Sequence, residues 1–301
     1  MNEEIKKLTD ALSTVILEKP EQIKLAICSL LCRGHLLIED LPGMGKTTLS
    51  HSLADVLGLT YRRVQFTSDL LPADITGTSI FNRENQSFEF HPGPIFSQVL
   101  LADEINRASP KTQSALLESM EEHQVTIDGV SHELPSPFFV IATQNPQHQS
   151  GTHPLPESQL DRFFMRISLG YPSEMAEAQL IKLAGKARKL TQAPQVIDGK
   201  TLLAYQQVVP DIVLSDAIID YILRLVNYTR SSGQFSDPLS PRASIALAAA
   251  SRAYAFISGR DFVIPDDVQA VFTSVCAHRL GVTTINEAEV KTQVFQNVPV
   301  H

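Results

Sequence analysis

The chain has 301 residues, 25 of them basic and 33 acidic, so its formal net charge is −8. Hydrophobic residues make up 43% and charged residues 19%, which excludes a wholly disordered chain. The acidic balance argues against a dedicated basic surface for nucleic acid. At roughly 150 residues per domain, the length corresponds to about two domains.

Three cysteines imply no disulfide framework and favour a reducing environment. Cys28 and Cys32 lie four residues apart in a helical pattern; redox or metal chemistry is one interpretation, and two small buried side chains is the favoured one. No run approaches the ~18 uncharged apolar residues of a membrane helix. The acidic start MNEEIKKLTD lacks the apolar core of a signal peptide. We therefore expect a cytoplasmic protein.

The first 60 residues indicate two helices, a strand and a third helix. Apolar residues recur with helical spacing over 5–16 and again over 23–31. The short apolar run at 36–38 predicts a strand. A Gly/Pro turn follows it, and a new helical pattern then extends to Leu57.

Four further strands are predicted at 61–66, 99–102, 138–142 and 163–169, with helices between them. The second and third of these runs are almost wholly apolar, as in strands covered on both faces. Ser109-Pro110 supplies a capping hydroxyl and a proline at the start of a helix. The alternation of strands and helices predicts an α/β fold with a parallel sheet.

Two stretches do not fit this alternation. Residues 87–96 (SFEFHPGPIF) indicate a hairpin or loop, and residues 123–134 indicate a hairpin that turns at Asp128-Gly129. From about 174 to 285 the pattern is all-helical, most clearly in the Ala-rich run 243–250. We therefore expect an α/β domain over 1–172 and an all-α domain over 173–301.

The segment DLPGMGKT, residues 40–47, follows a predicted strand and begins a helix, which is the context of a phosphate-binding P-loop. Glycines let the backbone approach phosphate oxygens, and the helix N-terminus offers free N–H groups. Lys46 would neutralise the β- and γ-phosphates, and the Thr47 hydroxyl would coordinate Mg²⁺. Asp40 stands where the general pattern has its first glycine. The residues expected to bind the nucleotide are Pro42, Gly43, Met44, Gly45, Lys46, Thr47 and Thr48.

Polar residues follow two of the apolar strands, at the sheet edge where ligands bind in doubly wound folds. After 99–102, Asp103 would hold the magnesium ion through water and Glu104 would polarise the attacking water. The alternative is a solvated acidic turn. After 138–142, Asn145 would hydrogen-bond the γ-phosphate or orient water, although Asn-Pro is also a common turn.

Two arginines and two histidines complete the candidates. Arg162 precedes a predicted strand, and Arg242 begins a helix of the second domain; lone arginines are most often solvated. His148 and His153 lie in a predicted loop with no helix to align them, so we expect no metal centre there.

Taken together, these segments resemble the MoxR family of AAA+ ATPases, within the clade that carries a helix-2 insert. The resemblance spans about 35 to 255, and the block 100–129 is far more specific than a P-loop. It implies a three-layer αβα core with a five-stranded parallel sheet and a helical lid; 87–96 would be the insert. The resembling stretches, in family order, are LIEDLPGMGKTTL, LLADEINRASPKTQSALLESMEEHQVTIDG, FFVIATQNP, GTHPLPESQLDRFFMRI and SPRASIALAAASRAYA.

The resemblance also assigns roles. Arg162 matches the arginine finger and Arg242 matches sensor 2, which would serve either its own site or a neighbour's. Arg107 is a second candidate for the interface arginine. Glu18-Lys19-Pro20 replaces a glycine-containing pair that borders the adenine in relatives. The remaining matches are Lys46 and Thr47 to Walker A, Asp103 and Glu104 to Walker B, and Asn145 to sensor 1.

The function implied is Mg²⁺-dependent ATP hydrolysis in a ring, a hexamer in the family, with a chaperone-like role in remodelling or maturing partner complexes. A protein with a von Willebrand factor A domain is the expected partner, and no nucleic acid is expected. Two alternatives stay open. One is a nucleic-acid or magnesium-chelatase-like motor, against which the net charge of −8 argues. The other is a nucleotide-gated scaffold with little turnover.

Overall fold

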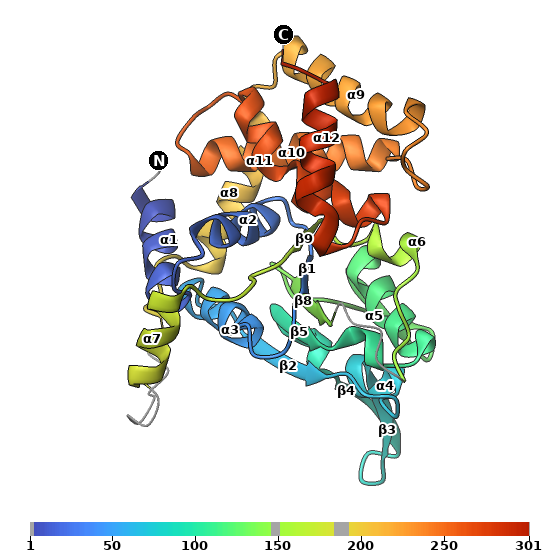
Figure 1. The fold of residues 1–301 in the computed structure, drawn as a ribbon. Coiled ribbons are helices and arrows are strands. Elements are labelled where there is room, and N and C mark those ends of the chain that lie inside the picture. The colour runs from blue at the N-terminus through green and yellow to red at the C-terminus, as the bar shows by residue number, and fades with distance from the viewer. Residues whose placement is uncertain (1–2, 146–150, 184–192, 301) are drawn as a thin grey trace.

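The computed structural model describes residues 3–145, 151–183 and 193–300. A five-stranded parallel sheet lies at its centre, in the order β2-β5-β8-β1-β9 (Figure 1). This order places β1 between two strands that come later in the chain. The strands are β1 (Leu36–Glu39), β2 (Tyr61–Gln65), β5 (Val99–Asp103), β8 (Phe139–Gln144) and β9 (Met165–Ile167). All five strands expected from the sequence are present.

Helices cover both faces of the sheet, because successive residues of each buried strand point in opposite directions. In β5, Val99 and Leu101 pack in a core with the first three helices, whereas Leu100 and Ala102 pack in a second core with the next two. The result is a three-layer α/β unit. These helices are α1 (Glu3–Val15), α2 (Pro20–Leu31), α3 (Lys46–Val56), α4 (Pro72–Thr76) and α5 (Pro110–Glu122).

Helix α5 begins as the sequence indicated. The Ser109 hydroxyl accepts a hydrogen bond from the Thr112 backbone N–H, and Pro110 occupies the first turn. The helix carries Leu116, Leu117 and Met120 into the second core. This packing fixes the position of the last turn of α5, which carries Glu121.

Two antiparallel hairpins extend from this unit. The expected one turns at Asp128-Gly129 and consists of β6 (Gln124–Ile127) and β7 (Val130–Glu133). In the other, β4 (Ser87–Pro92) pairs with β3 (Gly77–Asn82), a strand that the sequence analysis missed. Both strands of this hairpin are largely exposed, so their sequence carries no strong apolar pattern. The hairpin projects from the body in Figure 1.

The described residues after 173 form helices, joined by one isolated β-bridge between Val213 and Phe262. One of them, α8, lies against α2, where the Gln206 amide donates a hydrogen bond to the Leu30 carbonyl. The domain boundary near residue 172 stays a prediction. The helices are α7 (Glu174–Leu183), α8 (Gly199–Val208), α9 (Asp216–Ser231), α10 (Pro241–Ile257), α11 (Pro265–Cys276) and α12 (Glu287–Asn297), with the short α6 (Glu157–Leu160) preceding them.

The remaining expectations concern membranes, thiols and metals. None of the helices in the described part of the chain combines the length and apolarity needed to span a membrane. Cys28 is buried, and burial raises the pKa of its thiol, whereas Cys32 is partly exposed. His148 lies outside the described residues. Within those residues, no three His, Cys, Asp or Glu side chains gather as a metal site would require.

Candidate functional site

The loop between β1 and α3 has space around the backbone of its two glycines. Gly43 and Gly45 have φ angles of 86° and 90°, in the left-handed region that disfavours any side chain. A Cβ at either position would meet nothing within 4 Å, so the glycines are required by conformation and not by crowding. Helix α3 begins directly after Gly45, and its first N–H groups face this loop.

Lys46 lies at the first position of α3 and is largely buried. Its Nζ donates a hydrogen bond to the Asp40 backbone carbonyl over 2.7 Å. Burial lowers the pKa of Lys46, and the negative charges of Asp40, Asp103 and Glu104 oppose that shift. The amino group therefore lies among three acids, whose charges oppose the effect of burial on its pKa.

The structure explains why an acid occupies position 40. The Asp40 carboxylate accepts hydrogen bonds from the Ser168 hydroxyl (3.0 Å), the Gly170 N–H (3.2 Å) and the Leu169 N–H. These partners follow β9. A glycine at position 40 would leave this segment without its anchor, so Asp40 fixes the loop to the chain that leads to α7.

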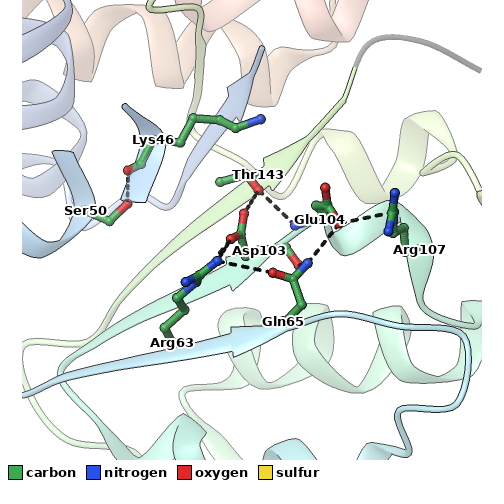
Figure 2. Close-up of polar contacts among 8 residues, drawn as sticks. All are labelled: Lys46, Ser50, Arg63, Gln65, Asp103, Glu104, Arg107 and Thr143. Carbon is green, nitrogen blue, oxygen red and sulfur yellow. Dashed lines mark hydrogen bonds and ion pairs between the residues drawn. The ribbon is translucent and has the colours of Figure 1, made fainter. Parts of the chain in front are cut away.

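Asp103 ends β5 with both carboxylate oxygens engaged. The Thr143 hydroxyl donates to Oδ1 over 2.6 Å, and the Arg63 guanidinium donates to Oδ2 from Nη2 (2.6 Å) and Nε (3.2 Å). The same Thr143 oxygen accepts a hydrogen bond from the Glu104 N–H. Figure 2 shows these contacts between the ends of three neighbouring strands.

Glu104 has a φ of 56°, which is uncommon for a residue with a side chain. Such strain persists where the surroundings enforce it and is frequent at functional sites. Its carboxylate accepts a hydrogen bond from the Gln65 amide at 2.9 Å and pairs with Arg107 Nε at 3.1 Å (Figure 2). Two side chains thus hold the acid in one orientation.

These groups surround a single cavity of about 380 Å³ at the carboxyl ends of the strands. The sequence analysis had identified most of its lining and missed two members, Arg63 and Gln65. Their alternate spacing on β2 is the available signal, because it places both on one face of the edge strand. The lining residues are Pro42, Gly43, Gly45, Lys46, Thr47, Thr48, Arg63, Gln65, Asp103 and Glu104.

A second, more apolar pocket of about 170 Å³ adjoins the first. The expected nucleotide residue Met44 lies here and not in the larger cavity. Lys19 also lines this pocket and donates a hydrogen bond to the Tyr171 carbonyl over 2.8 Å. The loop that contains Lys19 therefore lies beside the glycine-rich loop, and its contact with the adenine stays a prediction.

The structure places Arg162 and Arg242 away from that cavity and beside one another. Both approach the carboxylate of Glu121, Arg162 at 3.0 Å and Arg242 at 3.7 Å. They line a separate pocket together with His35 and Met120. Asn145 follows β8 at the carboxyl edge, next to the ends of β5 and β1, and is not among the residues that line the cavity.

Comparisons with known proteins agree with this geometry. The family model for the ATPase family associated with various cellular activities (AAA) matches residues 35–165, and the AAA lid domain model matches residues 227–298. A crystal structure of a protein from Cytophaga hutchinsonii, assigned as an ATPase, superimposes with a TM-score of 0.89 and 34% identity. The superposition covers 99% of this chain and 95% of the Cytophaga chain.

Two curated relatives are similar over most of their length. YeaC of Bacillus subtilis, an uncharacterised protein, is 45% identical over 274 residues, which cover 91% of this chain and 86% of YeaC. Chaperone MoxR1 of Mycobacterium tuberculosis is 41% identical over 278 residues, which cover 89% of this chain and 73% of that protein. On this evidence the chain belongs to the MoxR family of AAA+ ATPases.

Proposed function

We propose that this chain hydrolyses ATP with Mg²⁺ in a ring oligomer and uses the cycle to remodel or mature partner protein complexes. One observation carries the enzymatic part. Lys46, Thr47, Asp103 and Glu104, from two separate segments, line one cavity. A scaffold that only bound nucleotide would need the first two of these residues and not a catalytic acid.

The residues present suit magnesium, because hydroxyl and carboxylate oxygens are the ligands that this ion prefers. Thr47 would hold it directly and Asp103 through water. When bound, the ion supplies positive charge to the β- and γ-phosphate oxygens. Lys46 and the loop N–H groups bind the same phosphates, and the adjoining apolar pocket around Met44 takes the base.

Glu104 orients the attacking water and receives its proton. In the structure Gln65 and Arg107 both contact Oε2 of this carboxylate, so Oε1 is the oxygen that would accept the proton of the water. Asn145, which follows the neighbouring strand β8, would orient the same water or the γ-phosphate. Hydrolysis then depends on positioning and charge and needs no covalent intermediate.

Arg162 and Arg242 serve the neighbouring subunit. Both lie at the amino ends of the strands, since Arg162 precedes β9 and His35, which lines the same pocket, precedes β1. Lys46 follows the carboxyl end of β1, a strand of roughly 13 Å. A ring, proposed here as a hexamer, brings these arginines to the next subunit's nucleotide, and Arg162 is the trans arginine in preference to Arg107.

Two substitutions test the enzymatic proposal. Lys46→Ala is expected to abolish binding of a fluorescent ATP analogue, and Glu104→Gln to bind it normally while phosphate release falls by about 10²–10⁴-fold. Lys24→Ala, on the surface of α2, is the matched control. Unchanged nucleotide affinity in the Lys46 variant, or normal turnover in the Glu104 variant, would refute the assignment.

The partner protein is tested separately. We propose a protein with a von Willebrand factor A domain as the associate and no nucleic acid. Co-purification of the ATP-bound Glu104→Gln ring with such a protein supports this. Stimulation of phosphate release by single- or double-stranded DNA at low salt would favour the motor alternative.

A further inference from the structure

The carboxylate of Asp103 already has a cation beside it. Oδ2 accepts two hydrogen bonds from Arg63, through Nη2 and Nε, and Oδ1 accepts the Thr143 hydroxyl (Figure 2). Both oxygens of Asp103 are therefore engaged by residues of its own chain, and three of its roughly four acceptor sites are used. The proposed function requires the same carboxylate to accept hydrogen bonds from water bound to Mg²⁺.

Arg63 reaches this acid because of strand register. β2 pairs in parallel with β5, with Arg63 opposite Leu101, two residues before Asp103. Residues two apart in a strand share a face, so Arg63 and Asp103 lie diagonally on the same side of the sheet. The Arg63 side chain is 48% exposed, whereas that of Asp103 is only 10% exposed. The arginine can therefore move into solvent and the acid cannot.

The same guanidinium lines the cavity that contains Lys46 and Thr47. It opposes a divalent cation in two ways. It occupies one of the two oxygens that could accept a hydrogen bond from the metal's water shell, and its own charge repels Mg²⁺ at short range. A triphosphate in the cavity offsets part of both effects, because it offers anionic oxygens to the released arginine.

We propose that Arg63 is a positioning residue that holds Asp103 oriented and neutralised until Mg²⁺ arrives with the nucleotide, and so sets the Mg²⁺ concentration that nucleotide loading requires. The inference rests on the proposed function, since it assumes that Asp103 serves the metal. Arg63 releases Oδ2 when the loaded nucleotide enters and restores the pair when it leaves. Metal binding is thereby made dependent on nucleotide.

The first test measures binding and not turnover. A fluorescent ATP analogue is titrated with free Mg²⁺ in the wild type, Arg63→Gln and the control Arg62→Gln, whose side chain points to the opposite face of β2. Loss of a partly exposed bidentate pair is expected to lower the Mg²⁺ midpoint at least about threefold in Arg63→Gln. Arg62→Gln should match the wild type, and Arg63→Lys should lie between. An unchanged or raised midpoint in Arg63→Gln overturns the inference.

A second test omits nucleotide. Mn²⁺ binding, followed by electron paramagnetic resonance, should be tighter in Arg63→Gln than in the wild type by at least the same factor, because no phosphate is present to take the arginine, and equal affinities overturn the proposal. Thermal unfolding of each variant verifies that it is folded. Wild-type binding of the analogue at saturating Mg²⁺ tests the proposed function on its own, so the two failures are distinguishable.

Discussion

Two charged clusters lie at opposite ends of the same sheet, and they differ in how completely they are paired. At the carboxyl ends, Asp103 has every oxygen engaged and Glu104 is held by two side chains. At the amino ends, Arg162 and Arg242 share the single carboxylate of Glu121, which is 43% exposed. The first cluster is balanced within one chain, whereas the second has an excess of positive charge.

In the second cluster, the arginines have more hydrogen-bond donors than the one carboxylate can accept. Each guanidinium has five N–H donors, and one carboxylate offers about four acceptor sites. Glu121 therefore leaves most of the donors on Arg162 and Arg242 available to another anion. Under the proposed function, the nucleotide phosphates of a neighbouring subunit would be that anion. The second cluster would then be complete only in an assembly.

The largest effect is expected from a substitution that breaks the second cluster. Arg162→Ala should reduce turnover by about 10³-fold or more while nucleotide binding is retained, because an arginine supplied in trans acts on the transition state. Mixing Arg162→Ala with Lys46→Ala should restore part of the phosphate release. Mixed interfaces then pair an intact Arg162 with an intact Lys46.

Arg224→Ala, on the surface of α9, is the control and should leave turnover unchanged. Intact rings that show no recovery at any mixing ratio would exclude Arg162 as the trans residue. In that case Arg107→Ala tests the second candidate for the trans arginine. Within one chain, Arg107 pairs with Glu104.

A second prediction compares the stability contributed by a buried ion pair with that contributed by an exposed one. Arg166 of β9 is 5% exposed and pairs with Glu287 at 2.6 Å and Glu39 at 3.5 Å. Arg166→Met should lower the free energy of unfolding by about 3 kcal/mol, because it leaves the buried Glu39 and the partly buried Glu287 without their cation. Glu121→Gln, in the half-exposed cluster, should lower it by less than about 1 kcal/mol.

Urea denaturation of both variants measures this contrast. Arg224→Met removes an exposed pair with Asp220 and is the matched control for loss of an arginine. Equal destabilisation by Arg166→Met and Arg224→Met would contradict the assignment of Arg166 as a buried link between β1, β9 and α12.

Local sequence was sufficient to predict the five strands, the glycine-rich loop and the acids after β5. Each of these is determined by a contiguous pattern, such as the apolar run 99–102 or the glycines before Lys46. Their convergence also followed, because the carboxyl ends of parallel strands meet at one edge. Strand β3 was missed, since its residues are mostly exposed and show no apolar periodicity.

Long-range pairs were not predictable in the same way. Arg63 meets Asp103 only because β2 is the edge strand beside β5, and no local pattern encodes that neighbour. Glu121 meets Arg242 because α10 approaches the end of α5, which depends on the packing of later helices. The role of Asp40 likewise depends on Ser168 and Gly170, about 130 residues further on.

The smallest predicted effect comes from His35, which lines the pocket of the second cluster together with Arg162 and Arg242. Its Nδ1 accepts a hydrogen bond from the Val140 N–H, and its Nε2 lies 3.3 Å from the Met120 carbonyl. Burial lowers the pKa of His35 from 6.5 to about 4. Between these values the unfolded chain takes up a proton that the folded chain refuses, so stability falls as pH falls from 7 to 5.

By linkage, this group alone makes the protein about 2 kcal/mol less stable at pH 5 than at pH 7. His35→Gln should flatten that pH dependence in urea denaturation, and the exposed His91→Gln should not. A steeper slope in His35→Gln would contradict the assignment. Protonation would also place a positive charge in the pocket that holds Arg162 and Arg242, so acid should loosen the arginine cluster before it affects the phosphate cavity.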